Sequence, residues 1–189
     1  MFEKIKKLNK LSKKFEKLNE PEYNENGKRI IKINVKNDDG FLSPYSIKDT
    51  PILSSETVEF LEHAVKDTDS DDEISFEISS NVIDENEEKE YADAIKNYYS
   101  REIVETKEKF KKNTISSAVM IFLGILVFAL RIIFSSNFQN EIILNVLDVV
   151  AWVFVWEATD LFFFKRSEIR AKQLNNLKIY TADIIFKKN

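Results

Sequence analysis

The sequence predicts an α+β membrane protein, in which a two-helix transmembrane hairpin carries a small cytoplasmic α+β domain. The first observation is a pair of apolar runs, residues 114–134 and 142–164, separated by a short polar turn. As helices rising about 1.5 Å per residue, each run spans about 30–34 Å, the thickness of a bilayer's hydrocarbon core. The second observation is the basic residues at both outer ends of the hairpin. The third is a set of short β-branched segments that predict about three strands, alongside two to three helices.

Hydropathy and charge divide the chain into six segments. Neither Pro nor Gly lies between Asp84 and the first apolar run, so we expect one helix to leave the soluble domain and enter the membrane. The predicted segments are a basic amphipathic helix (1–20), a cytoplasmic α+β domain (21–112), a first transmembrane helix (113–135), an external turn (136–141), a second transmembrane helix (142–164), and a cytoplasmic helix and strand that return to the domain (165–189).

The flanks of the hairpin predict its orientation. The turn between the apolar runs contains no Lys or Arg, and the N-terminus lacks the apolar core of a cleavable signal peptide. By the positive-inside rule, we expect a multi-pass protein of the plasma membrane with both termini in the cytoplasm. The basic flanking residues are Lys107, Lys109, Lys111, Lys112, Lys165, Arg166, Arg170 and Lys172.

The N-terminal segment combines an apolar helical stripe with a high density of lysine. Residues 1–18 carry seven Lys against two Glu, and Leu8, Leu11, Phe15 and Leu18 fall on one side of a helix. This pattern favours a helix on the anionic surface of the membrane, or a helix packed on the protein's own acidic domain. The residues expected at the lipid surface are Lys6, Lys7, Lys10, Lys13, Lys14, Lys165 and Arg166.

The segment between the basic helix and the membrane predicts a small mixed domain. Alternation predicts strands at RIIKINVK and EISFEIS, which we expect to pair as a hairpin. Between them, Ser55 is expected to be the N-cap of a short helix, ETVEFLEHAV. Asp84 and Glu87 form a capping-box pattern at the start of the long helix. KIYTADIIF, near the C-terminus, is expected to add a third strand, because a two-stranded hairpin is marginally stable alone.

Composition excludes several classes of function. Residues 19–100 carry 21 acidic and 8 basic side chains, so this region repels nucleic acid, which we do not expect as a partner. The absence of Cys removes thiolate metal sites and Cys nucleophiles. The acidic loop DTDSDDE opens like a calcium-binding loop, but Asp72 and Ile78 occupy the positions of its essential Gly and Glu. We therefore expect no cofactor, no metal and no enzymatic activity.

Polar side chains interrupt both apolar runs and are expected to face partners, because a carboxylate near the bilayer centre costs about 2.5–3.5 kcal/mol. Folding the hairpin about its turn brings Arg131 level with Asn145, one helical turn from Asp148. Arg131 and Asp148 then either lock the two helices together or form part of a polar path within an oligomer. The predicted intramembrane polar or partner contacts are Arg131, Asn145, Asp148, Glu157 and Asp160.

Helix packing is predicted from small and aromatic residues. Ser117 and Gly124 recur at heptad spacing in the first run and allow helix backbones to approach closely. A helical wheel places Trp152 and Trp156 on the polar stripe of the second run, so we expect them to pack between the helices. Glu157 points away from that stripe, and therefore needs a second protomer, another membrane protein, or protonation.

Two functional hypotheses follow from these patterns. The first is an integral membrane protein whose cytoplasmic module serves interaction or sensing, in an assembly, regulatory or scaffold role. The alternative is a small homo-oligomeric pore or transport subunit that uses Arg131, Asp148 and Glu157, because two helices cannot enclose a path alone. In both cases the expected partners are membrane lipid and either further copies of this chain or another membrane protein.

Overall fold

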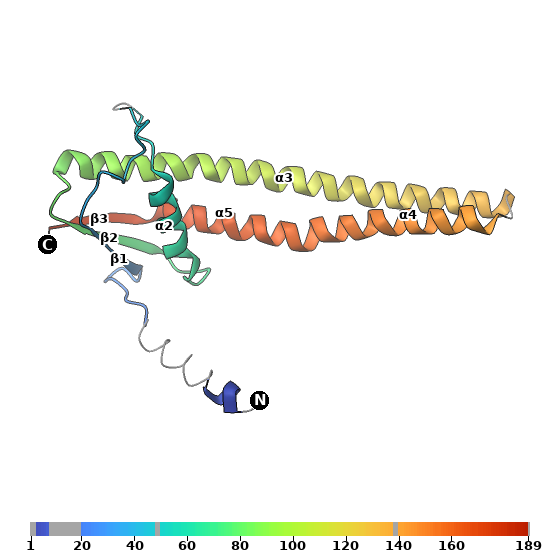
Figure 1. Cartoon of the computed structure of the whole chain (residues 1–189), viewed down its shortest axis with the longest axis horizontal. Helices are drawn as coiled ribbons and strands as arrows, with labels where there is room; N and C mark the ends of the chain where they lie inside the picture. Colours follow the sequence, from blue (N-terminus) through green and yellow to red (C-terminus); the bar gives the residue numbers. More distant parts are fainter. Residues whose placement is uncertain (1–2, 8–19, 48–49, 138–139, 189) are drawn as a thin grey trace. The chain divides into compact units, whose positions relative to one another are not determined.

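The computed structural model describes residues 3–7, 20–47, 50–137 and 140–188, and it separates into two compact units. The first unit comprises the chain up to Lys96 together with Lys178–Asn189, and the second comprises Asn97–Leu177. The long helix α3 (Glu85–Asn137) contributes its first turns to one unit and the remainder to the other (Figure 1). The prediction of one uninterrupted helix that begins after Asp84 and continues through the first apolar run is confirmed.

The first unit is built on a three-stranded parallel sheet. Its strands are β1 (Arg29–Val35), β2 (Ile74–Ser80) and β3 (Asp183–Lys187), in the spatial order β1-β2-β3 (Figure 1). Both pairs are parallel, with Phe76 opposite Ile31 on one side and opposite Ile184 on the other. Because β2 is central, five of its seven residues are fully buried, which is the burial expected of an inner parallel strand. The fold is α+β, as predicted.

The expected hairpin between the first two strands is wrong. Parallel strands need a crossover connection of a dozen or more residues, and the chain between β1 and β2 provides one that contains α2 (Ser55–Lys66). The C-terminal strand is also shorter than predicted. Residues up to Thr181 belong to helix α5 (Arg166–Thr181), and β3 begins only at Asp183.

Helix caps in the first unit follow local hydrogen bonding. The Glu87 N–H donates to Asp84 Oδ1 at 2.9 Å, and the Asp84 N–H donates to Glu87 Oε2 at 2.8 Å, so the predicted capping box is confirmed. Helix α2 is capped one residue earlier than expected, because the Thr57 N–H donates to the side chain of Ser54.

The core of the first unit joins apolar side chains from the sheet and from three helices. Phe76 of β2, Leu61 and Val65 of α2, Ile95 of α3 and Ile179 of α5 are each at most 2% exposed. Charged contacts then tie the C-terminal segment to the rest of the unit. The Lys28 ammonium lies 2.8 Å from Asp183, and Lys96 and Lys178 donate to backbone carbonyl oxygens of the segments they face.

The second unit is an antiparallel pair of long helical arms (Figure 1). The first arm is α3 from Asn97 onward. The second arm consists of α4 (Glu141–Asp160), a π-helical turn η1 (Leu161–Lys165), and α5 up to Leu177. The chain thus contains two helices long and apolar enough to cross a membrane, and only 11% of the most apolar window of each is buried.

Two predicted segments are described only in part. Residues Glu3–Lys7, which include Lys6 and Lys7, are helical and exposed. Lys10, Lys13 and Lys14 lie outside the described residues, as do positions 138–139 of the predicted external turn. The membrane-surface role of the N-terminal segment therefore stays a prediction.

Candidate functional site

The face of α3 that meets the second arm follows an unbroken heptad pattern. A row of buried or half-buried positions alternates steps of four and three residues over more than thirty residues, and Glu102 and Leu123 are half-buried beside this row. Several of these positions carry polar or small side chains, where a water-soluble coiled coil carries large apolar ones. We call this row the α3 seam: Tyr99, Ile103, Thr106, Phe110, Asn113, Ser117, Met120, Gly124, Val127 and Arg131.

The facing row on the second arm has the same spacing with one interruption. Steps of three and four residues alternate until Leu161, but the next seam position is Arg166, five residues further on. The extra residue lies in η1, where the Arg166 N–H donates to the carbonyl oxygen of Leu161 in an i to i+5 bond. The second-arm seam is Leu144, Leu147, Ala151, Phe154, Ala158, Leu161, Arg166, Ile169, Gln173 and Asn176.

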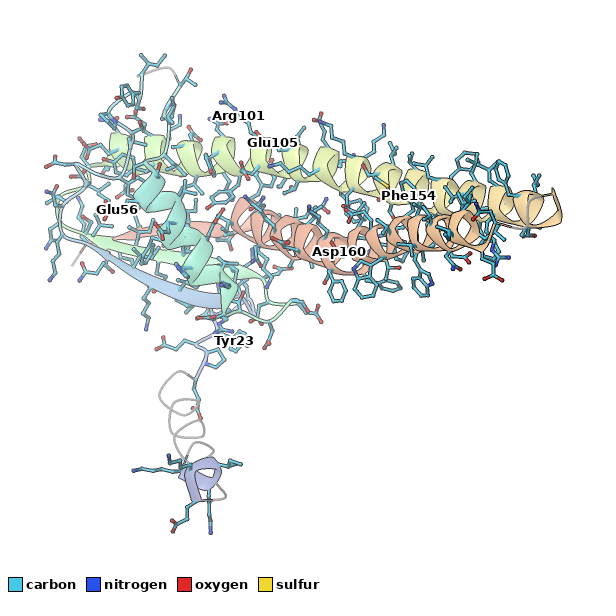
Figure 2. All side chains as sticks on the ribbon, turned by 45° about the vertical axis from the view of Figure 1, so that its right-hand side comes forward. Tyr23, Glu56, Arg101, Glu105, Phe154 and Asp160 are labelled. Carbon is cyan, nitrogen blue, oxygen red and sulfur yellow. The ribbon has the colours of Figure 1, made fainter. Side chains whose placement is uncertain are left out.

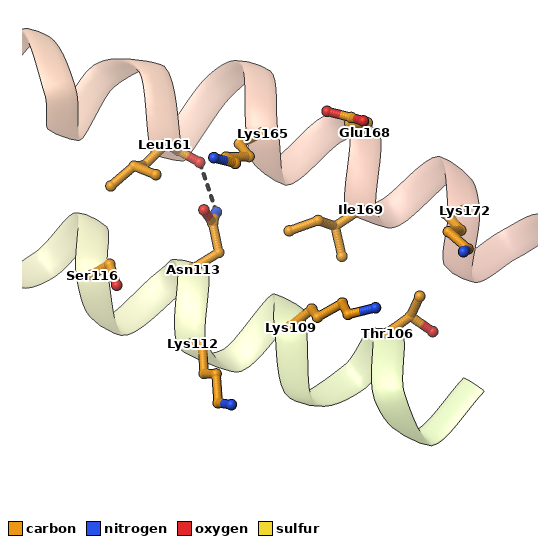
Figure 3. A pocket seen from close by; sticks show the side chains of 10 residues that line it. All are labelled: Thr106, Lys109, Lys112, Asn113, Ser116, Leu161, Lys165, Glu168, Ile169 and Lys172. Carbon is orange, nitrogen blue, oxygen red and sulfur yellow. Dashed lines mark hydrogen bonds between the residues drawn. The ribbon is translucent and has the colours of Figure 1, made fainter. Parts of the chain in front are cut away.

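The seam brings the two arms into direct polar contact at the π turn. The Asn113 side chain donates a 2.7 Å hydrogen bond to the carbonyl oxygen of Leu161, and both residues are at least nine-tenths buried (Figure 3). One turn further along α3, the Ser117 hydroxyl donates to the carbonyl oxygen of Ala158 at 3.1 Å. Both acceptors are backbone groups of the opposite arm, so these contacts fix the register of the two helices.

The two arms lie close together at Gly124. A Cβ at this position would lie 3.2 Å from Cγ2 of Val155, 3.4 Å from Cβ of Phe154 and 3.6 Å from the carbonyl oxygen of Ala151. A side chain there would require these neighbours to shift, and small residues of this kind let helix backbones approach closely. Ser117 and Gly124 both lie on the α3 seam and are buried.

The structure brings Arg131 and Asp148 together. Nε of Arg131 lies 3.1 Å from Oδ1 of Asp148, with the two side chains 35% and 38% exposed. The ion pair joins α3 to α4 and leaves neither charge alone on the apolar part of the hairpin. A cavity beside it is lined by Gly124, Phe128, Asp148 and Trp152, among others.

The remaining polar candidates are not brought into the seam. Asn145, Glu157 and Asp160 are exposed, and none of them makes a side-chain hydrogen bond or ion pair within the described part of the chain. Figure 2 shows the second arm, with Asp160 labelled, and aromatic side chains that project from it away from α3.

The predicted packing role of Trp152 and Trp156 is wrong for the interface within this chain. Their side chains are 68% and 69% exposed, whereas Ala151 and Ala158 are 6% and 2% exposed and occupy the seam. The physical reason is the close approach of the two backbones, which leaves room for alanine but not for an indole ring. The tryptophans lie on the outer surface of α4.

A basic groove that was not predicted from the sequence opens between the arms around the π turn. Its volume is about 480 Å³. Figure 3 shows the side chains of Lys109 and Lys165 on opposite helices, both on the side of the Asn113 contact that faces away from Ser116. We call this the basic groove, and it is lined by Thr106, Lys109, Lys112, Asn113, Ser116, Leu161, Lys165, Glu168, Ile169 and Lys172.

Arg166 is held beside the groove by aromatic rings. Its guanidinium lies 4.9 Å from the ring centre of Phe110 on α3 and 5.1 Å from that of Phe162 on η1. Continuing the heptad spacing of Ser117 and Gly124 backward along α3 reaches Phe110 and Ile103, and the interleaved row of the same heptad contains Asn113 and Thr106. That extension is the signal that could have located this end of the seam from the sequence.

No family model matches the sequence, and neither a curated protein nor a solved structure matches it. The fold and the helix pair alone therefore define the class: an α+β protein with a three-stranded parallel sheet and two long apolar helices that could span a membrane. Within the described residues, no group of His, Asp and Glu side chains could hold a metal ion. In the acidic loop, Asp72 is instead paired with Arg29 at 3.1 Å.

Proposed function

We propose that the chain is an integral protein of the plasma membrane, with α3 and α4 forming a transmembrane hairpin and both termini in the cytoplasm. The parallel-sheet unit is then a cytoplasmic module, non-enzymatic itself, that serves assembly, sensing or scaffolding. The observation that carries the proposal is the exposure of the apolar helices. A soluble protein buries such helices in its core, but here only 11% of each apolar window is buried.

Charge along the two arms supports the boundaries of the membrane segments. On α3 the lysines at 107, 109, 111 and 112 end where the apolar run begins, and on the second arm Lys165 and Arg166 follow Phe164 directly. Between these limits, the cation at position 131 is paired with Asp148. Pairing lowers the cost of placing a charge at membrane depth, which supports a locking role for this ion pair.

The helix pair continues beyond these limits as a stalk. Residues 97–112 of α3 and 166–177 of α5 are mostly polar, and 16 residues of helix extend about 24 Å at 1.5 Å per residue. An ion pair at 3.2 Å between Lys172 and Glu102 joins the two helices of the stalk. In this proposal the same seam runs from the hairpin into the cytoplasmic stalk, so that a change of register in one part is passed to the other.

Glu157 supports a protein partner inside the membrane. It is exposed on α4, on a surface that would otherwise face lipid. A carboxylate there costs about 2.5–3.5 kcal/mol unless it is paired or protonated. We therefore propose that this surface meets another copy of the chain or a second membrane protein. The pairing of Arg131 with Asp148 within one chain favours such assembly over the alternative, a pore that uses both side chains.

Topology provides the direct test, and the absence of Cys makes single-cysteine variants straightforward. In intact cells, a membrane-impermeant maleimide should label Ser136→Cys from outside and should label Ser167→Cys only after permeabilisation. The protein should also remain with the membrane fraction after an alkaline carbonate wash. Release by carbonate, or labelling of Ser167→Cys in intact cells, contradicts the proposal.

A further inference from the structure

The basic groove lies where both arms change from apolar to basic sequence. On α3 it extends from Thr106 to Ser116, and on the second arm from Leu161 to Lys172. These ranges straddle the membrane boundaries given above. If the hairpin is inserted as proposed, the groove therefore lies at the depth of the cytoplasmic lipid headgroups.

The charge of the groove is strongly positive. Four lysines line it against one carboxylate, that of Glu168. Within the described residues, Lys112 and Lys165 form no ion pair. Lys109 is paired only with Glu105 on its own helix, at 3.4 Å, with both side chains more than half exposed. Such an exposed pair contributes little and leaves the ammonium available to an anion.

The rest of the lining suits a phosphate ester attached to acyl chains. Ser116 contributes a hydroxyl-bearing side chain to the lining beside the apolar Ile169, whereas the side chains of Thr106 and Asn113 donate to backbone carbonyl oxygens. Immediately toward the apolar run, Phe162, Phe163 and Phe164 are 44%, 63% and 71% exposed. A headgroup in the groove would thus have its acyl chains beside three exposed aromatic rings.

We propose that the basic groove binds the phosphate group of an anionic membrane lipid, and this inference rests on the proposed membrane insertion. The π turn builds the site. In an unbroken heptad, position 165 would follow Leu161 into the seam, but the extra residue places Arg166 there, stacked between aromatic rings. Lys165 is thereby left exposed at the groove. Pockets of this volume are typical of small-ligand sites, and basic pockets beside cytoplasmic helix ends bind lipid headgroups.

The test uses the full chain, purified in a mild neutral detergent and titrated with phosphatidylglycerol. Bound lipid is counted by native mass spectrometry, and the melting temperature is followed in parallel. The groove variant is Lys109→Gln/Lys165→Gln. The control variant, Lys107→Gln/Lys111→Gln, removes the same charge from exposed positions that do not line the groove. Phosphatidylcholine and inorganic phosphate serve as the two comparison ligands.

We expect the wild type to bind phosphatidylglycerol in preference to phosphatidylcholine. The groove variant should lose about thirtyfold in affinity, about fivefold for each lysine near an anionic lipid, while the control variant stays within about threefold. Equal losses in both variants would overturn the proposal, because they would show general surface attraction. Equal stabilisation by inorganic phosphate would also overturn it, since the ligand would then be a free anion.

Failure of this inference and failure of membrane insertion give different results. A chain that resists carbonate extraction but shows no lipid preference overturns the lipid site alone. A chain that is soluble without detergent overturns the proposed function first. The melting temperature of both double variants in neutral detergent controls for folding, and we expect it to match the wild type, because all four lysines are exposed and Gln is a good helix former.

Discussion

Removing one member of the Arg131–Asp148 pair should cost more than removing both. In the wild type, Nε of Arg131 lies 3.1 Å from Oδ1 of Asp148. Arg131→Leu leaves the carboxylate on α4 without this partner, and Asp148→Ala leaves the guanidinium on α3 without it. In the double variant, Arg131→Leu/Asp148→Ala, both charges of the pair are absent, so neither is left without its partner. Breaking a buried pair is strongly destabilising, whereas replacing the whole pair by apolar groups is often neutral.

The size of the effect follows from the partial exposure of the pair. A lone charge at the centre of a membrane helix costs about 2.5–3.5 kcal/mol, but Arg131 is three residues from the end of the apolar run and can reach the far interface. Polar contacts between membrane helices average about 0.6 kcal/mol and reach about 1.7 kcal/mol. We therefore expect each single variant to lose about 1–2 kcal/mol, and the double variant to recover about 0.5–1.5 kcal/mol of the summed losses.

Thermal unfolding in mild detergent, followed by circular dichroism, measures the stability of the wild type, the two single variants and the double variant. The matched control cycle pairs Arg131→Leu with Glu157→Ala, a carboxylate on the same helix that lies outside the seam. That control should be additive. Strictly additive losses in the Arg131–Asp148 cycle as well would refute the locking role, and Asp148 would then require a partner outside this chain.

Two further predictions concern other parts of the molecule. Burial raises the pKa of the Tyr91 hydroxyl, and so does the 2.9 Å hydrogen bond that it donates to Asp38. The protonated hydroxyl therefore stabilises the fold below its unfolded pKa of about 10, and this contribution is lost as the pH rises toward the folded pKa. Chemical denaturation should thus show a steeper alkaline loss of stability in the wild type than in Tyr91→Phe, and equal slopes would contradict the assignment. Light scattering in mild detergent should find the wild type in a larger complex that Glu157→Ala weakens and Asp160→Ala does not, and a monomeric wild type would argue against the proposed contact.

Much of the fold could be predicted because local patterns carry it. The capping box at Asp84 and the absence of Pro and Gly up to position 123 are enough to predict one long helix. The alternation in β1 and β2 predicts strands but contains no information on their relative direction. Direction is set by the connection, and a crossover through α2 was needed to infer the parallel pairing.

The seam of the second arm could not be predicted from periodicity. In a membrane helix the lipid-facing side is as apolar as the packed side, so the usual apolar stripe vanishes. A helical wheel then favours the conspicuous residues, such as Trp152 and Trp156, although the interface contains Ala151 and Ala158. The pairing of Arg131 with Asp148 was accessible because it depends only on the length of the turn.

The π turn and the basic groove were beyond sequence reasoning for a related reason. The segment Leu161–Lys165 contains neither Gly nor Pro, and no local signal indicates an inserted residue. The insertion becomes visible only when the positions buried on the second arm are compared with the unbroken heptad of α3. It is a property of two segments in contact, and neither sequence contains it alone.

The parallel pairing of β3 with β2 has a consequence for biogenesis. The two strands are neighbours in one sheet, yet the chain that connects them, residues 81–182, contains both apolar helices. In the proposed topology, β3 reaches β2 only when the chain has crossed the bilayer twice. In a product that crosses the bilayer only once, Asp183–Lys187 lies on the opposite side of the membrane from β2, and the edge of β2 stays unpaired. In that topology a complete sheet requires correct insertion of both helices, and an unfinished sheet would expose unpaired backbone groups at the edge of β2.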